Sequence, residues 1–392
     1  MAENENKGSK VSDLMAYKKK RKQKSLIIKL IAVLAIFILV IVIAANFSAI
    51  VEPLRGIASK IETKTSDEVG YPIKLSGSAS YYFDSFGENF SLLTDTYLYT
   101  YNIDGGQNFA FRHGYSNPIQ CTNSKRVLLY DKDYYSFSLF NRTRQLYSET
   151  LEDKIVFSSL GGDDSAAVVT NSDRYSNIIY VYDGQGQWRY TRKYIDENVM
   201  NVQFSADERY IYVCVMGVEN GEIYTSISKY DITSETDAIW SYKLQRSSLP
   251  VKMYVKNGRV CVLYNDYGIS LSEPDGSLIG QKEFLGTVQC CDYGGTNLGL
   301  IYLDSSNNKK ILTVLNSEMT VLATKTVSPN INRIISDGGR IYVVESGVLC
   351  GYDSNGEKAA EKQLSEEYSS FIKIGNAVLL LSYNSVDLEE IN

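Results

Sequence analysis

Residues 182–188 read Tyr-Asp-Gly-Gln-Gly-Gln-Trp, and a similar stretch, Tyr-Asp-Ser-Asn-Gly, occupies residues 352–356. In both, a strand-forming segment ends on an aromatic residue, an acidic residue follows, and turn formers that include glycine lead into a second segment. Asp and Asn suit such turns because their side chains accept hydrogen bonds from nearby backbone amides, and glycine adopts positive φ. Seven turns of this kind can be found, and their acidic or amide residues are Asn102, Asn141, Asp183, Asp231, Glu273, Asn316 and Asp353.

The spacing of these turns predicts the architecture. Successive positions lie 39, 42, 48, 42, 43 and 37 residues apart, a period of about 42, which is typical of β-propeller blades. Two further strand-like segments precede each turn, as at Val202–Ser205 and Tyr210–Val215. Four strands per repeat and the absence of long helical periodicity predict an all-β propeller of four-stranded blades.

The two ends of this repeat region indicate how many blades there are. The first full repeat begins near Ser80, whereas Phe371 to Asn392 leaves room for only three strands. Ile73-Lys74-Leu75 precedes the first repeat and could supply the missing outer strand. Such pairing would close the ring and cover exposed strand edges. We therefore expect eight blades, with seven as the alternative.

A different pattern occupies the N-terminal region. Leu26 to Ala45 forms a run of twenty residues whose single charge, Lys29, is close enough to the end to reach the lipid headgroups. This length predicts one transmembrane helix, and a cleaved signal peptide ending near Val42-Ile43-Ala44 is the alternative. The predicted membrane anchor includes Leu26, Ile27, Ile28, Leu30, Ile36, Phe37, Val40 and Ile43.

Charge around this run predicts its orientation. Residues 1–25 carry eight Lys or Arg against three Asp or Glu, and the basic residues directly before the run are Lys18, Lys19, Lys20, Arg21, Lys22 and Lys24. The positive-inside rule places residues 1–25 in the cytoplasm as a basic tail, where they would touch anionic lipid. Residues 46–70 are then a stalk or linker, and residues 71–392 form an ectodomain outside the cell membrane.

The repeat also carries a resemblance. Tyr182 to Trp188 and Tyr352 to Glu357 are similar to the repeats of quinoprotein-like and WD40-like β-propellers. The whole arrangement resembles an uncharacterised bacterial family of single-pass membrane proteins with such an ectodomain. The resemblance implies the fold and a binding or scaffolding role, and it implies no cofactor. The sequence departs from the quinoprotein enzymes in having only two tryptophans, Trp188 and Trp240, where the enzymes have one in most blades.

Several kinds of chemistry are disfavoured by composition. From Asn46 onward there are 31 basic and 43 acidic residues, which does not suit nucleic-acid binding. The only histidine, His113, allows neither an imidazole metal cluster nor most His-based triads, and we expect it in a surface loop. We predict no catalytic residue, metal or cofactor. The even number of cysteines allows disulfides, but their positions in strands favour free cysteines that act as small buried apolar residues. The six are Cys121, Cys214, Cys261, Cys290, Cys291 and Cys350.

Two functions are consistent with these features. The first is a non-catalytic, membrane-tethered binding or scaffolding propeller at the cell envelope, whose partner is a protein, a peptide or a glycan. The second is an exported hydrolase, which would need two carboxylates converging at the mouth of the propeller channel. The 31 tyrosines are expected to pack between blades with hydroxyls at the rim, and the alternative is a carbohydrate- or peptide-binding surface.

Overall fold

The computed structural model describes residues 70–75, 81–234 and 237–391, and all of them belong to one compact unit, Thr65–Asn392. The predicted tail, the transmembrane helix Leu26–Ala45 and the stalk up to residue 69 lie outside the described residues. Within the described ranges, no helix is long and apolar enough to cross a membrane.

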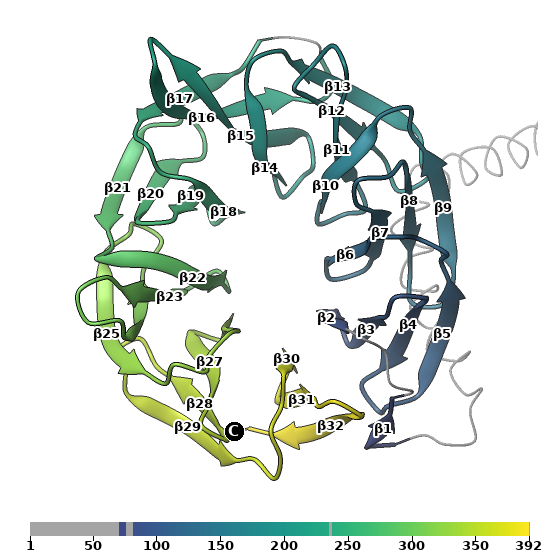
Figure 1. Ribbon diagram of the computed structural model, residues 1–392, viewed down its shortest axis with the longest axis vertical. Helices are drawn as coiled ribbons and strands as arrows, with labels where there is room; N and C mark the ends of the chain where they lie inside the picture. Colours follow the sequence, from purple (N-terminus) through teal and green to yellow (C-terminus); the bar gives the residue numbers. More distant parts are fainter. Residues whose placement is uncertain (1–69, 76–80, 235–236, 392) are drawn as a thin grey trace, which may run out of the picture. The chain divides into compact units, whose positions relative to one another are not determined.

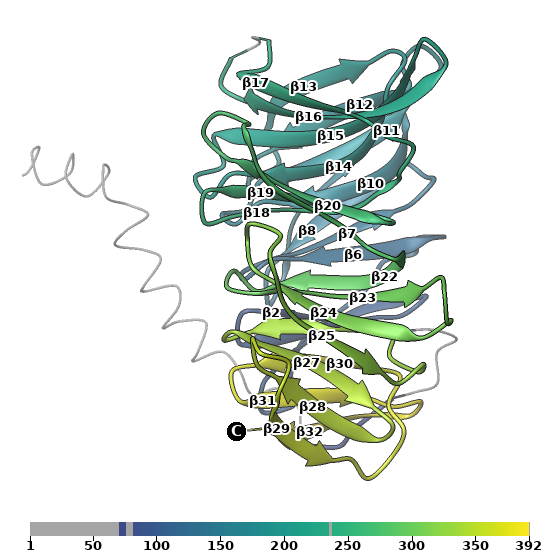
Figure 2. The ribbon, with the colours of Figure 1, turned by 90° about the vertical axis from the view of Figure 1, so that its left-hand side faces the viewer.

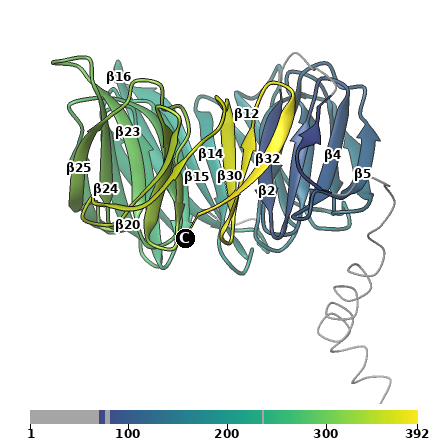
Figure 3. The same cartoon turned by 90° about the horizontal axis from the view of Figure 1, so that it is seen from below.

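The described residues form eight antiparallel sheets of four strands each, arranged around a central axis (Figure 1). The strands run roughly along that axis, as the two side views show (Figures 2 and 3). This arrangement is an eight-bladed β-propeller. It confirms the predicted fold class and blade number, and the seven-blade alternative is wrong.

The blades are numbered in chain order, each written from its innermost to its outermost strand. Blade 1 comprises β2 (Tyr82–Phe86), β3 (Asn89–Leu93), β4 (Tyr97–Asn102) and β5 (Gln107–Arg112), and blade 2 comprises β6 (Pro118–Thr122), β7 (Val127–Asp131), β8 (Ser136–Phe140) and β9 (Gln145–Thr150). Blade 3 comprises β10 (Lys154–Leu160), β11 (Ala166–Asn171), β12 (Asn177–Tyr182) and β13 (Trp188–Tyr194). Blade 4 comprises β14 (Asn198–Phe204), β15 (Tyr210–Glu219), β16 (Glu222–Asp231) and β17 (Trp240–Gln245).

Blade 5 comprises β18 (Pro250–Lys256), β19 (Arg259–Tyr264), β20 (Tyr267–Ser272) and β21 (Leu278–Glu283), and blade 6 comprises β22 (Gly286–Tyr293), β23 (Leu298–Asp304), β24 (Lys310–Leu315) and β25 (Val321–Val327). Blade 7 comprises β26 (Ile335–Asp337), β27 (Arg340–Glu345), β28 (Val348–Tyr352) and β29 (Lys358–Gln363). Blade 8 comprises β30 (Ser370–Ile374), β31 (Ala377–Leu381), β32 (Ser385–Glu390) and β1 (Ile73–Lys74).

The hydrophobic core is divided among the junctions between neighbouring blades. In β7, Val127 and Leu129 pack against blade 1, whereas Leu128 and Tyr130 pack against blade 3. Successive side chains of a strand point to opposite faces, so a strand with a blade on each side is apolar throughout. Each of the eight clusters found among the described residues joins two adjacent blades, including blades 8 and 1.

The two ends of the propeller meet in blade 8. Strand β1 pairs with β32, with Ile73 opposite Val386 and Lys74 opposite Ser385. The Leu75 amide extends the pairing by donating to the Asn384 carbonyl at 2.8 Å. In Figure 3, β30 and β32 of blade 8 lie beside β2 of blade 1. The prediction that Ile73-Lys74-Leu75 supplies the outer strand of the last blade is therefore confirmed.

The seven turns identified from the sequence all connect the third and fourth strands of a blade. Six of them share one device, in which a side-chain oxygen accepts backbone amide hydrogens. Asp353 Oδ1 accepts the amides of Asn355 and Glu357, both at 2.9 Å. The same device occurs at Asn102, Asn141, Asp183, Asp231 and Asn316.

Glu273 differs from the other six residues because its side chain bridges blades 4 and 5. Its Oε1 accepts hydrogen bonds from Lys229 Nζ at 3.2 Å and from the Tyr212 hydroxyl, and its carbonyl accepts Trp240 Nε1 at 3.1 Å. In this blade, Asp275 caps the turn instead, by accepting the Ser277 amide at 3.1 Å. The regular spacing therefore located the turn but not the role of Glu273.

Candidate functional site

The first strand of each blade lies nearest the axis and forms the inner wall of the ring (Figure 1). A cavity of about 590 Å³ opens inside this wall, with lining residues from blades 1, 2, 5, 6, 7 and 8. Its size falls in the range of small-ligand sites. We call it the central cavity and treat it as the candidate functional site.

A series of hydrogen bonds fixes the wall of the central cavity from blade 5 to blade 7. The Tyr254 hydroxyl of blade 5 donates to the Cys291 carbonyl of blade 6 at 3.1 Å. In turn, the Ser336 amide of blade 7 donates to Asp292 Oδ2 of blade 6 at 2.7 Å. Burial raises the pKa of the Asp292 carboxyl above its usual range. Neighbouring blades thus hold one another at the cavity surface.

Arg333 continues this series across blade 8 to blade 1. It lies in the connection between β25 and β26, and its guanidinium donates to Ser370 Oγ at 3.0 Å and to the Phe83 carbonyl at 2.9 Å. The same group contacts Asp84 Oδ1 at 3.3 Å, while Thr122 Oγ1 of blade 2 donates to Asp84 Oδ2 at 3.0 Å. One arginine and one carboxylate therefore tie together the cavity surfaces of blades 7, 8, 1 and 2.

The charged residues of the cavity are mostly cations. Four basic side chains line it, against two carboxylates, those of Asp84 and Asp292; the basic residues are Lys252, Lys256, Arg333 and Lys373. Lys252, Tyr254 and Lys256 alternate along β18, so their side chains point to the same side of the strand, toward the axis. Lys256 Nζ donates to the Tyr293 carbonyl at 3.1 Å.

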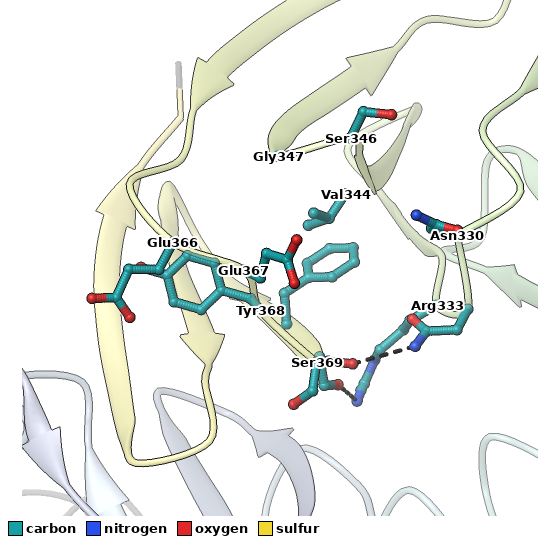
Figure 4. Close-up of a pocket in the computed structure, with 12 residues that line it drawn as sticks. Asn330, Arg333, Val344, Ser346, Gly347, Glu366, Glu367, Tyr368 and Ser369 are labelled. Atoms are coloured by element: carbon teal, nitrogen blue, oxygen red, sulfur yellow. Dashed lines mark hydrogen bonds between the residues drawn. The ribbon is translucent and has the colours of Figure 1, made fainter.

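A smaller pocket of about 270 Å³ lies beside the central cavity, between blades 7 and 8 (Figure 4). Glu366, Glu367 and Tyr368 enter it from the connection between β29 and β30, and Asn330 from the connection between β25 and β26. Arg333 lines both this pocket and the central cavity, so the two spaces share a wall.

Each carboxylate of the central cavity has its own hydrogen-bond partners. Asp84 binds Arg333 and Thr122, whereas Asp292 binds the Ser336 amide. A hydrolase would use two carboxylates that act on the same bond. Among the described residues, no group of three or more His, Cys, Asp or Glu side chains could hold a metal ion.

His113 lies in the connection between blades 1 and 2, away from the central cavity. Its Nδ1 accepts the Tyr115 amide at 3.0 Å, so its Nε2 carries the proton and donates to the Thr94 carbonyl at 3.2 Å. Burial lowers the pKa of the imidazole. His113 is thus a neutral structural residue of this loop.

All six cysteines are free thiols. Burial raises the pKa of Cys121 and Cys214 to about 12, and that of Cys261 and Cys290 to about 11. Burial also raises the pKa of Cys291 and Cys350. Because the thiolate is the reactive form, these thiols should react slowly near neutral pH.

The sequence interpretation did not single out the cationic residues of the central cavity. None of the seven turn residues lines the central cavity. Of the histidine and cysteine residues considered from the sequence, only Cys290 and Cys291 line the central cavity. The alternation Lys252, Tyr254, Lys256 was visible in the sequence. It gains meaning only when β18 is known to be an innermost strand with its side chains facing the axis.

An eight-bladed ring with a polar cavity at its axis defines an eight-bladed β-propeller, similar in fold to WD40 proteins. The chain belongs to DUF5711, a family of unknown function whose sequence profile matches residues 60–391. The comparison with curated proteins gave no match.

Solved structures share the fold at low sequence identity. Sqt1 from Saccharomyces cerevisiae is 7% identical with a TM-score of 0.61, over 83% of this chain and 100% of that one. BamB from Moraxella catarrhalis is 12% identical with a TM-score of 0.56, over 82% and 99%. The C-terminal WD40 domain of Sif2 is 12% identical with a TM-score of 0.58, over 83% and 99%. These similarities concern the fold alone.

Proposed function

We propose that this protein is a membrane-anchored β-propeller that acts as a non-catalytic binding and scaffolding module at the cell envelope. The observation that carries the proposal is the central cavity, whose wall is held by hydrogen bonds between successive blades from blade 5 round to blade 2. A wall fixed in this way presents its polar groups in a constant geometry, and such preorganisation lowers the cost of binding.

The arrangement of the cavity carboxylates favours binding over hydrolysis. Asp84 is paired with the Arg333 guanidinium and Asp292 accepts a backbone amide, so each carboxylate has a structural role in the wall. The solved propellers similar in fold include BamB and WD40 proteins. Their fold is consistent with a scaffold that binds a protein, a peptide or a glycan.

Membrane anchoring rests on the N-terminal sequence. The apolar run Leu26–Ala45 follows six basic residues between Lys18 and Lys24. In the proposed orientation, residues 1–25 are cytoplasmic and the propeller lies outside the membrane.

Cysteine labelling in intact cells will test this orientation. Asn355 is exposed in a blade 7 turn, so Asn355→Cys should react with a membrane-impermeant maleimide added to intact cells. Ser9→Cys, in the basic tail, should react only after permeabilisation. The native thiols should add little background because burial raises their pKa. Labelling of Ser9→Cys but not Asn355→Cys in intact cells would show that the orientation is wrong.

Capture from detergent-solubilised cells will test the binding role. The full chain, tagged at its N-terminus, should retain at least one envelope protein, peptide or glycan after cross-linking in intact cells. The full chain carrying Tyr71→Ser, Ile73→Ser and Leu75→Ser serves as the matched control, because it keeps the N-terminal region but its closing strand loses its packing. If the full chain captured no partner and instead hydrolysed members of a glycan or peptide library, the scaffold role would be wrong.

A further inference from the structure

The central cavity has a charge opposite to that of the rest of the ectodomain. From Asn46 onward the sequence carries 31 basic and 43 acidic residues, a net charge of −12. The cavity nevertheless collects four basic side chains against two carboxylates. In a narrow space with low-dielectric walls, such an excess of one sign produces a focused local potential.

Two of the four cations are already matched by carboxylates. Arg333 contacts Asp84 Oδ1 at 3.3 Å, and Lys373 contacts Asp337 Oδ2 at 2.6 Å. Lys373 also lies 4.9 Å from the centre of the Tyr342 ring. These two side chains have structural partners, so they are not the source of the unmatched charge.

Lys252 and Lys256 are the unmatched cations. Both are exposed at the cavity, and Lys256 Nζ contacts two neutral groups of Tyr293, its carbonyl at 3.1 Å and its ring at 6.0 Å. Among the described residues, neither lysine forms an ion pair with a carboxylate. Asp292 also lines the cavity and accepts the Ser336 amide, and its single negative charge faces the two lysines.

The position of the two lysines on β18 suits an extended anion, because residues four apart on a strand are separated by roughly 13 Å. Lys252 lies two positions before Tyr254 and Lys256 two positions after it, so the three side chains are on one face of the strand and line the cavity. The Tyr254 hydroxyl is committed to the Cys291 carbonyl, so this residue between the two lysines is fixed to the wall of blade 6. An anion with several oxygens can accept hydrogen bonds from both lysines at once.

We infer that the central cavity binds a polyanionic ligand, through carboxylate or phosphate groups that pair with Lys252 and Lys256. This inference rests on the proposed binding function and specifies its ligand class. A ligand group of this kind would supply the charge that the cavity lacks, at a site already fixed by contacts between blades. The shared chemistry is an oxyanion, and the two sources are a carboxylate-bearing peptide or glycan and a phosphate-bearing compound.

Binding to the purified full chain in detergent will test this inference. The probes are inorganic tripolyphosphate for the phosphate source and a hexaglutamate peptide for the carboxylate source, measured by calorimetry at low and at high salt. At least one probe should bind, with an affinity that falls as salt screens the lysines. The double variant Lys252→Gln/Lys256→Gln should weaken that binding roughly 100-fold, about tenfold for each lysine that can no longer donate a charge-assisted hydrogen bond.

Two further variants make the result specific. Lys282→Gln/Lys309→Gln removes the same charge from exposed positions in an outer strand and in a turn, and should bind within about twofold of the native chain. Lys252→Arg/Lys256→Arg keeps the charge and should retain binding even if the glutamine variant folds poorly. The inference is wrong if the native chain binds neither probe, or if the cavity and outer glutamine variants lose affinity equally. If either happened while partner capture persisted, the anion site alone would fail and the scaffold role would stand.

Discussion

Replacing Tyr71, Ile73 and Leu75 with serine will lower the free energy of unfolding of the propeller by about 3–5 kcal/mol. These three side chains alternate along and beside β1 and are partly buried, whereas Pro72 and Lys74 between them are exposed. They pack against a cluster that joins blade 8 to blade 1. Tyr71 also donates its hydroxyl hydrogen to the Ile103 carbonyl at 3.0 Å.

The effect should be large because this junction closes the ring. β1 contributes only two paired residues to β32, so side-chain packing must hold it in place. If the strand detaches, the edge of β32 and the apolar residues of the junction become exposed together. We therefore expect a less cooperative transition as well as a lower midpoint.

Guanidinium unfolding followed by circular dichroism and by tyrosine fluorescence will measure both effects. Lys74→Ser, in the same strand but exposed, should change the free energy of unfolding by less than about 0.5 kcal/mol. A triple variant as stable and as cooperative as Lys74→Ser would mean that the ring does not depend on its closing strand.

The features that were predictable from the sequence are those with local causes. The turn at Asp353 depends on amides two and four residues further along, so its chemistry is contained in a short segment. Ring closure was also predictable, because counting strands left the last blade one short and only Ile73–Leu75 remained to fill it.

The central cavity could not be predicted in the same way because its residues meet only through the closure of the ring. Arg333 and Asp84 are 249 positions apart, yet they contact each other at 3.3 Å. No periodicity in the sequence encodes that pairing. Lys252 and Lys256 likewise look like ordinary strand lysines until β18 is placed on the inner wall.

Glu273 shows the same limit within a single repeat. Spacing aligned it with Asp353, but its longer side chain reaches blade 4, where Lys229 is only 7% exposed. The Lys229 ammonium also lies 4.3 Å from the centre of the Tyr210 ring and 5.4 Å from that of Tyr212. Aromatic faces stabilise the cation, and Glu273 provides its only carboxylate ion pair among the described residues.

Glu273→Ala is therefore expected to destabilise the propeller by about 3 kcal/mol, because it leaves a buried ammonium without its counter-charge. Asp353→Ala, at the equivalent turn of blade 7, should cost only about 1 kcal/mol, since it removes hydrogen bonds to exposed amides. Glu273→Gln keeps an acceptor for Lys229 and Tyr212 and should fall between the two.

Chemical denaturation of the three variants under one set of conditions will test this ranking. Lys229→Met combined with Glu273→Ala should recover part of the lost stability, because no charge then remains buried between blades 4 and 5. Equal losses for Glu273→Ala and Asp353→Ala would show that Glu273 only caps its turn. The contact with Lys229 would then contribute nothing to holding the two blades together.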